Sequence, residues 1–247
     1  MKISFFEEFP DADNLSKLSL LDFPTKLYVA ASSCKDFKRI ALKIKNKNVK
    51  EIVYWPILTR KEGYWVSPFS ERKALLRVFE ELKSKKLPIM LDLELPTTQN
   101  FWLYLKSYNF FKNKKLIREF IDEYKGNVYL AEYYPEGELK EKILFCLGLH
   151  YNKVKVIKMM YHSLHSFSEN LLRKKLKKGL QKYGDNYLVG LGTISVGVHG
   201  NDPILSADQL RKDLQLAEEV GVSEVVIFRL GGLNKEYLKV LKKCQTD

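Results

Sequence analysis

Eight short runs of apolar and β-branched residues recur along the chain, and each is followed by a turn and a stretch with helical spacing. The runs begin roughly 24 to 40 residues apart, which is the length of one strand–helix unit. Alternating strands and helices favour a parallel α/β sheet, and eight units favour its closure. The sequence therefore predicts a single (β/α)8 TIM-type barrel of the α/β class over residues 1–247. We expect its strands at Ile3–Glu8, Leu27–Ser32, Ile52–Ile57, Pro88–Glu94, Val128–Tyr133, Val156–Tyr161, Leu188–Thr193 and Val225–Leu230.

Polar residues mark the places where several helices should begin. Ser70, Ser206 and Asn234 each precede a stretch whose apolar residues share one helical face, and such residues cap helices by accepting backbone N–H groups. Asn113 is expected to open a further helix in the same way. Gly221 should end the helix that Ser206 begins, because glycine tolerates the left-handed backbone of a C-cap.

Composition bounds the class of protein. With 247 residues, 45% of them apolar, the chain can bury one large core. No apolar run approaches the ~20 residues that cross a bilayer, so we expect a cytoplasmic protein with no membrane partner. The net charge of +12 comes from lysine clusters on the expected outer helices, with acids nearby. This pattern indicates solvated helix faces, as in a thermophilic protein, and argues against a nucleic-acid partner.

The stretch Leu87–Pro96 carries the strongest functional signal. Side chains alternate along a strand, so its leucines and isoleucine fall on one face, and Asp92 and Glu94 fall on the other. The C-terminal ends of barrel strands are where such folds collect their chemistry. The two charges repel, which favours an acid that keeps its proton beside an ionised carboxylate, as glycosidic bond cleavage requires. A structural role, with both acids bound to Arg229 or a lysine, is the alternative.

Two short motifs resemble those of chitinase-like glycoside hydrolases. Asp92-Leu93-Glu94 resembles the end of their strand-four D-x-x-D-x-D-x-E motif, and Met159-Met160-Tyr161 resembles their strand-six M-x-Y. Leu87 and Met90 stand at the positions of the earlier aspartates. The resemblance implies a barrel glycosidase in which Glu94 is the general acid, Asp92 orients the substrate N-acetyl group and Tyr161 supports the intermediate.

The ends of the other strands should add a polar pocket on the same rim. We expect substrate contacts from acids, aromatics, a histidine and an arginine, namely Glu8, Tyr54, Trp55, Glu132, His162 and Arg229. The loops after strands three and four hold aromatic rings that suit sugars or simply pack a loop, namely Tyr64, Trp65, Trp102, Tyr104 and Tyr108. The expected ligand is therefore a small sugar-like or phosphorylated molecule.

Glycines follow strands seven and eight, where many barrels bind a phosphate through backbone N–H groups. Gly192, Gly231 and Gly232 are candidates for such a site, and Arg229 favours an anionic ligand there. The alternative is that these glycines serve only the strand-to-helix turns.

Carboxylates and histidines at successive strand ends leave a metal site open as an alternative. Glu94, Glu132, His162 and His199 could bind a divalent cation, as in sugar isomerases built on barrels. Our first interpretation has no metal and no other cofactor. Lys158 could form a Schiff base if it faced inward, but an apolar interior favours the opposite register.

Three functions remain open on the sequence. The first is hydrolysis, or another acid/base reaction, of a carbohydrate-like substrate at the C-terminal rim. The second is metal-dependent isomerisation or epimerisation of a sugar phosphate. The third is a basic barrel without catalytic activity that serves as a binding module.

Overall fold

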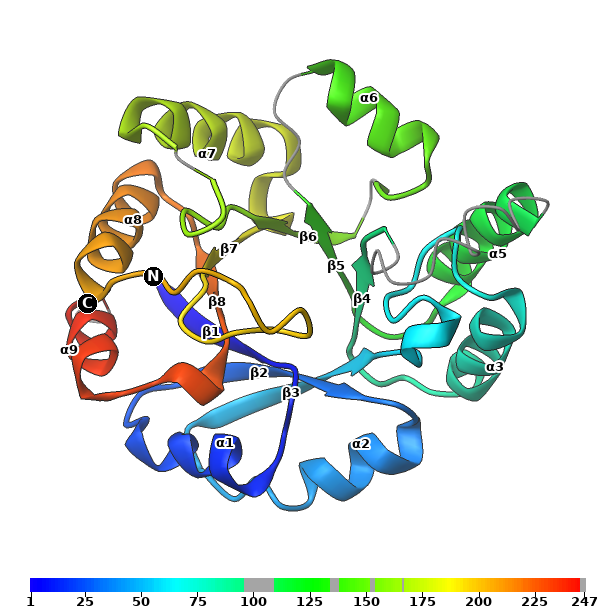
Figure 1. Ribbon diagram of the computed structural model, residues 1–247, viewed down its shortest axis with the longest axis horizontal. Helices are drawn as coiled ribbons and strands as arrows, with labels where there is room; N and C mark the ends of the chain where they lie inside the picture. Colours follow the sequence, from blue (N-terminus) through cyan, green and yellow to red (C-terminus); the bar gives the residue numbers. More distant parts are fainter. Residues whose placement is uncertain (96–108, 134–137, 152–153, 166, 245–247) are drawn as a thin grey trace. The chain divides into compact units, whose positions relative to one another are not determined.

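Eight parallel strands form a closed barrel in sequence order, which confirms the predicted (β/α)8 fold (Figure 1). The computed structural model describes residues 1–95, 109–133, 138–151, 154–165 and 167–244. All eight strands lie within a few residues of their predicted places. They are β1 (Lys2–Glu7), β2 (Thr25–Ala31), β3 (Val49–Pro56), β4 (Ile89–Leu93), β5 (Val128–Tyr133), β6 (Lys155–Met159), β7 (Tyr187–Gly192) and β8 (Glu224–Phe228).

Helices alternate with the strands. The α-helices are α1 (Ala12–Ser16), α2 (Cys34–Ala41), α3 (Arg72–Lys83), α5 (Phe110–Glu123), α6 (Glu138–Cys146), α7 (Glu169–Tyr183), α8 (Ala207–Val220) and α9 (Lys235–Lys243). Short 3-10 turns are η1 (Lys17–Leu20), η2 (Arg60–Glu62), η4 (Gly184–Asn186) and η5 (Leu230–Gly232). No helix among the described residues is both long and apolar enough to cross a membrane.

Two of the predicted N-caps are confirmed and two are wrong. Ser206 and Asn234 accept N–H groups from the first turns of α8 and α9, and Gly221 ends α8 in the left-handed conformation. Ser70 caps no helix, because its hydroxyl donates to the Trp65 carbonyl within the preceding loop. Asn113 lies inside α5, where its buried amide donates to backbone carbonyls of that same loop.

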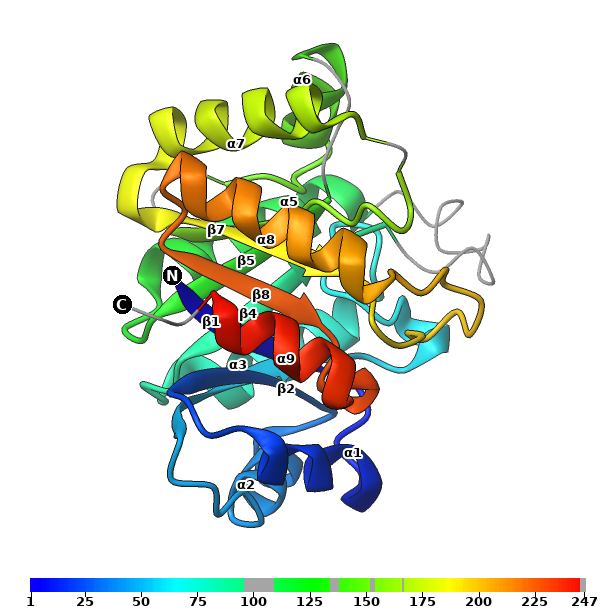
Figure 2. The ribbon, with the colours of Figure 1, turned by 90° about the vertical axis from the view of Figure 1, so that its left-hand side faces the viewer.

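The chain divides into two compact units. The first unit comprises Met1–Ala30, Ile40–Ile52 and Lys155–Asp247, and the second comprises Ala31–Arg39 and Val53–Val154. In the first unit, α7, α8 and α9 cover β6, β7 and β8 on one side (Figure 1). Figure 2 shows α8 and α9 next to each other along β8, and the two helices pack together.

Strand register separates the two faces of the first unit. Tyr187 stacks on Tyr183 of α7 with ring centroids 6.0 Å apart, so the odd-numbered residues of β7 face the helices. Lys158 pairs with Val189 and therefore shares the helix side. Met159 pairs with Gly190 and lies on the opposite face. This is the strand-six register that the apolar interior favours.

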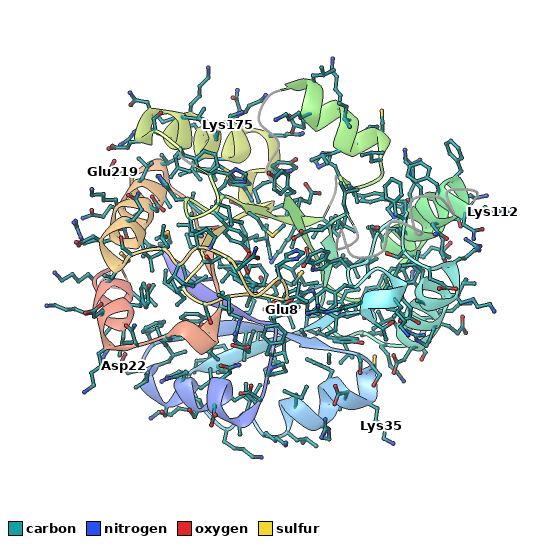
Figure 3. All side chains as sticks on the ribbon, viewed as in Figure 1. Glu8, Asp22, Lys35, Lys112, Lys175 and Glu219 are labelled. Atoms are coloured by element: carbon teal, nitrogen blue, oxygen red, sulfur yellow. The ribbon has the colours of Figure 1, made fainter. Side chains whose placement is uncertain are left out.

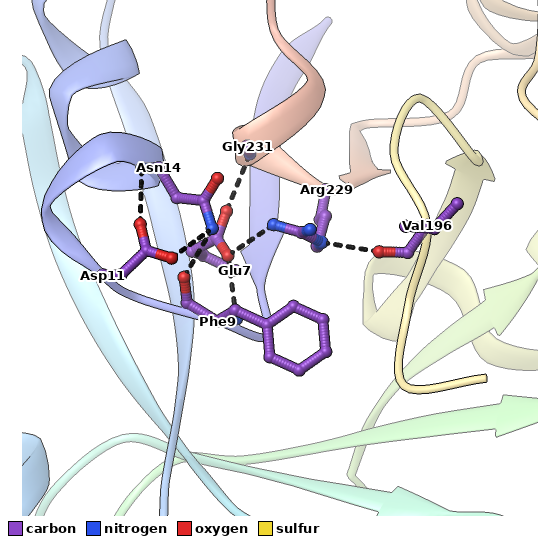
Figure 4. Close-up of polar contacts among 7 residues, drawn as sticks. All are labelled: Glu7, Phe9, Asp11, Asn14, Val196, Arg229 and Gly231. Atoms are coloured by element: carbon purple, nitrogen blue, oxygen red, sulfur yellow. Dashed lines mark hydrogen bonds and ion pairs between the residues drawn. The ribbon is translucent and has the colours of Figure 1, made fainter. Parts of the chain in front are cut away.

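A buried ion pair joins the ends of β1 and β8 (Figure 4). Arg229 Nη1 lies 3.0 Å from Glu7 Oε1, and the N–H groups of Phe9 and Gly231 donate to the same carboxylate at 2.8 and 2.7 Å. Arg229 Nε also donates to the Val196 carbonyl at 3.0 Å, which ties the loop after β7 to this network. Burial raises the pKa of Glu7 to about 7, although Arg229 and the two N–H donors act in the opposite direction.

In the second unit, α3 and α5 pack together through the stacked rings of Phe79 and Phe120, whose centroids are 4.1 Å apart. The loop after β3 is fixed by Glu62 at the end of η2. Its carboxylate accepts the N–H and the hydroxyl of Thr59 and forms a two-point ion pair with Arg77 of α3 at 2.8 and 3.0 Å. This loop carries Trp65 and is therefore anchored to the helix that follows it.

We expect Gly231→Ala to lower the free energy of unfolding by about 2–3 kcal/mol. A Cβ at this position would lie 2.3 Å from Asn14 Oδ1 and 2.4 Å from Arg229 Nη1, so the amide and the guanidinium must both shift, and the shift strains the ion pair with Glu7. Urea denaturation followed by circular dichroism measures the effect.

A matched control for this substitution is Gly200→Ala, because nothing lies within 4 Å of the added methyl group there. Its positive φ of 75° should cost about 1 kcal/mol. Adding Asn14→Ala to Gly231→Ala should recover part of the loss, since one of the two clashing groups is then absent. Equal stability of Gly231→Ala and the wild type would contradict the importance of this contact.

We expect Glu62→Gln to destabilise the protein by about 1–2 kcal/mol at neutral pH, a figure that allows for the solvent exposure of Arg77. Hydrogen bonds from Arg77 hold the pKa of Glu62 at about 2, below its ordinary value of 4.5. The stabilisation is therefore complete above pH 4.5 and is lost as the pH falls towards 2. Thermal unfolding of both proteins between pH 2 and 7 should show the difference vanish at the acid end, whereas the exposed Glu80→Gln should change little at any pH.

Candidate functional site

Asp92 of β4 lies on the face of the strand opposite the helices, as the alternation predicts. Tyr54 of β3 stacks on Phe37 of α2 at 5.0 Å between ring centroids, so Tyr54 faces the helices. Tyr54 pairs with Ile89, which places Ile89 on the same helix side. Asp92 is three residues from Ile89 and therefore points to the opposite face, whereas Glu94 follows directly after the last residue of β4, Leu93.

Aromatic residues of the adjacent strands share that opposite face. Trp55 follows Tyr54 and is buried, while Tyr133 stands at the end of β5 with 43% of its surface exposed. Asp92 pairs with Ala131, whose methyl group is the smallest side chain on this part of β5. Asp92 is 4% exposed, and Glu94 is more accessible than Asp92 at the end of the strand. Asp92 is thus a deep acid on this face of β4, and Glu94 is a shallower acid just beyond the end of the strand.

Glu132 does not share this face. It pairs with Leu93, so it points to the helix side of β5. There its carboxylate lies 2.8 Å from His150 Nδ1 and accepts the N–H of Tyr151 at 3.3 Å, and it is fully buried. The structure therefore places Glu132 in a polar contact with the loop after α6, on the face opposite Asp92.

The other aromatic candidates of the second unit are part of the core. Tyr54 is fully buried, burial raises the pKa of its hydroxyl, and that hydroxyl has no hydrogen-bond partner among the described residues. Tyr64 and Trp65 are also buried, and their rings meet edge to face at 5.4 Å, which favours loop packing over ligand contact. Trp102, Tyr104 and Tyr108 lie outside the described residues.

In the first unit, Glu8 and Tyr161 surround the ring of Phe228. Tyr161 lies 5.9 Å from that ring between centroids. A Cβ built on Gly197 would lie 2.9 Å from the Phe228 ring and 3.0 Å from Glu8 Oε2, so the loop after β7 passes directly over the Glu8 carboxylate. Asp202 accepts the Gly197 N–H at 2.6 Å and brings a second carboxylate beside the first. Figure 3 shows Glu8 on the inner side of β1, away from α1.

His162 faces α8 rather than the Phe228 ring. Its Nδ1 lies 3.2 Å from Asp213 Oδ1, and Gln209 donates to the same oxygen at 2.8 Å. Burial raises the pKa of Asp213, and its second carboxylate oxygen has no partner among the described residues. Sequence reasoning missed this trio because β6 ends at Met159, and the strand alternation no longer orients side chains beyond that point.

Arg229 and the three candidate glycines are explained by close packing. The guanidinium of Arg229 is 3.0 Å from Glu7, and the N–H groups of Gly231 and Gly232 already donate within the chain. A Cβ on Gly232 would lie 1.8 Å from the Ile194 carbonyl oxygen, and one on Gly192 would lie 2.6 Å from the Phe228 carbonyl oxygen. The turn interpretation of these glycines therefore accounts for them without a phosphate.

The alternative metal ligands do not assemble. No three acids, histidines or cysteines in the described parts of the chain form a group that could hold a metal ion. Glu132 contacts His150 on the helix side of β5, His162 contacts Asp213, and His199 is exposed on the loop after β7.

Comparison with known proteins places the fold among TIM barrels. The class V chitinase of Pseudomonas fluorescens Pf-5 has a TM-score of 0.58 at 10% identity, with 99% of each chain covered. The chitinase RmChi1 of Rhizomucor miehei has a TM-score of 0.54 at 12% identity, with 100% of each chain covered. A xylose isomerase domain protein of Planctomyces limnophilus has a TM-score of 0.55 at 9% identity, covering 98% of this chain and 94% of that chain.

The sequence matches no protein-family model and no curated protein. At identities of 9–12%, the likeness to these structures establishes the fold and leaves the activity to the site. The weak resemblance to chitinase-like glycoside hydrolases is thus supported at the level of the barrel.

Proposed function

We propose that the protein is a carbohydrate-active enzyme that works by acid/base chemistry at the C-terminal end of β4, with Glu94 as proton donor and acceptor. The observation that carries this proposal is the succession of Asp92 and Glu94 at the C-terminal end of β4, with one acid buried and the other half-buried.

The chemistry assigns the two acids different tasks. Glu94, at the accessible end of the strand, donates a proton to the leaving oxygen of a glycosidic bond and recovers one from water afterwards. Asp92 lies two residues deeper, about 7 Å along the strand, and acts on the substrate and on Glu94 through its charge. In the resemblance to chitinase-like enzymes, this residue orients an N-acetyl group.

Aromatic surface beside the acids supports a sugar ligand. Tyr133 is 43% exposed at the end of the adjacent strand, whereas Trp55 is buried and supports this face from below. Flat rings next to carboxylates suit the apolar face of a pyranose while the acids meet its hydroxyl groups. Tyr161 is proposed as a further catalytic residue on the motif resemblance alone, and Glu8 is proposed as a substrate contact.

We expect Glu94→Gln to lower kcat by about 10²–10⁴-fold on any glycoside that the wild type cleaves, because the amide cannot transfer a proton. Nitrophenyl glycosides of glucose, N-acetylglucosamine and its short oligomers form the substrate panel. Binding of the best substrate, measured by calorimetry, should weaken far less than turnover, since the shape of the side chain is kept.

Glu80→Gln is the matched control, because this glutamate is exposed on α3 and should leave turnover unchanged. Asp92→Asn should reduce turnover and weaken binding together. Wild-type turnover by Glu94→Gln would exclude Glu94 as the proton donor.

A further inference from the structure

Helix α6 presents its apolar residues to solvent. An outer helix of a barrel usually buries one apolar stripe, as α3 does with Ala74, Leu75, Val78, Phe79 and Leu82. Among the described side chains of α6, Leu139–Cys146, none is buried. Leu139 is 73% exposed and Ile143 is 46% exposed.

The exposed residues of α6 form a stripe with lysines on both sides. Leu139, Ile143 and Cys146 follow one another at intervals of four and three residues, so they share one face of the helix. The half-buried Glu141 and Leu144 lie on the opposite face, towards the rest of the second unit. On the helix surface, the exposed Lys140 and Lys142 flank the stripe.

The first turn of α5 extends this surface. Lys114 Nζ donates to the Cys146 carbonyl at 2.7 Å and lies 6.0 Å from the centroid of the Phe145 ring, so the start of α5 lies against the end of α6. One turn before Lys114, Phe111 is 79% exposed. Lys112 and Lys115 are exposed nearby, with the Lys115 ammonium 3.6 Å from the exposed Glu119 carboxylate, and Figure 3 shows Lys112 pointing away from the molecule. We call the surface formed by Phe111, Lys112, Lys115, Leu139, Lys140, Lys142, Ile143 and Cys146 the α5–α6 patch.

We propose that the α5–α6 patch docks on the surface of an anionic lipid bilayer. Apolar side chains surrounded by lysines fit such a surface, because the apolar groups enter the acyl boundary while the ammonium groups meet anionic headgroups. The sequence predicts no membrane partner on the ground that no segment is long enough to span a bilayer. Peripheral docking requires no such segment.

Two other binding partners fit the lysines and apolar side chains of the α5–α6 patch less well. A second copy of this chain on a two-fold axis would bring the flanking Lys140 and Lys142 of both copies together, which costs free energy. A nucleic acid would meet the lysines but would leave Leu139 and Ile143 against phosphates and sugars, where aliphatic groups gain nothing.

Cosedimentation with phosphatidylcholine vesicles, with and without phosphatidylserine, tests this proposal on the full chain. We expect binding to the anionic vesicles that weakens as salt is raised, and little binding to the neutral ones. Leu139→Ser with Ile143→Ser should reduce the binding at least about tenfold, because the inserted groups are removed while every lysine stays.

Leu42→Ser is the matched control, because Leu42 is 72% exposed outside the α5–α6 patch and its loss should leave vesicle binding unchanged. Circular dichroism confirms that each variant is folded. Equal binding by the double variant would assign the attraction to the overall charge of the chain and overturn the proposal. A concentration-dependent dimer in sedimentation velocity that the double variant abolishes would also overturn it, in favour of a second copy.

Discussion

A charge on a strand that is covered on both faces must be compensated where it stands. Removing an ionised group from water costs several kcal/mol unless hydrogen bonds or an opposite charge replace the lost solvation. Three buried acids of the described chain obey that constraint. Glu7 meets Arg229 and two N–H groups, Glu132 meets His150 and Tyr151, and Glu224 meets Ser4 and Lys26.

Position along the strand separates these acids from the candidate catalyst. Glu7 and Glu132 lie on the helix sides of their strands and join the barrel to its loops. Glu94 follows the last residue of β4 and is half-buried, and Asp92 is buried two residues before it. Its place at the strand end and its partial exposure therefore single out Glu94 more sharply than residue type does.

Alternation and caps predict much of this fold from the sequence, and their limits explain the rest. The strand positions and the side of β4 that carries Asp92 follow from residue spacing, because leucines alternate with acids over Leu91–Glu94. The face of Glu132 could not be predicted, since β5 reads Val-Tyr-Leu-Ala-Glu-Tyr and both of its faces are apolar before the acid. The predicted N-caps at Ser70 and Asn113 were wrong because both side chains donate hydrogen bonds to backbone carbonyls of the loop before α3. The bond from Asn113 to the Ser70 carbonyl joins residues 43 positions apart, which no local pattern reveals.

The five residues of β4 supply two different faces, one packed against helices and one that carries Asp92. Each leucine that packs beneath the helices is next to a position on the opposite face, so losing a single residue from this strand would exchange the two sets. Asp92 would then point into the apolar packing between the strand and its helices, and the leucines would point to the opposite face. Single substitutions in β4 consequently change one face at a time, whereas a deletion within the strand changes both faces together.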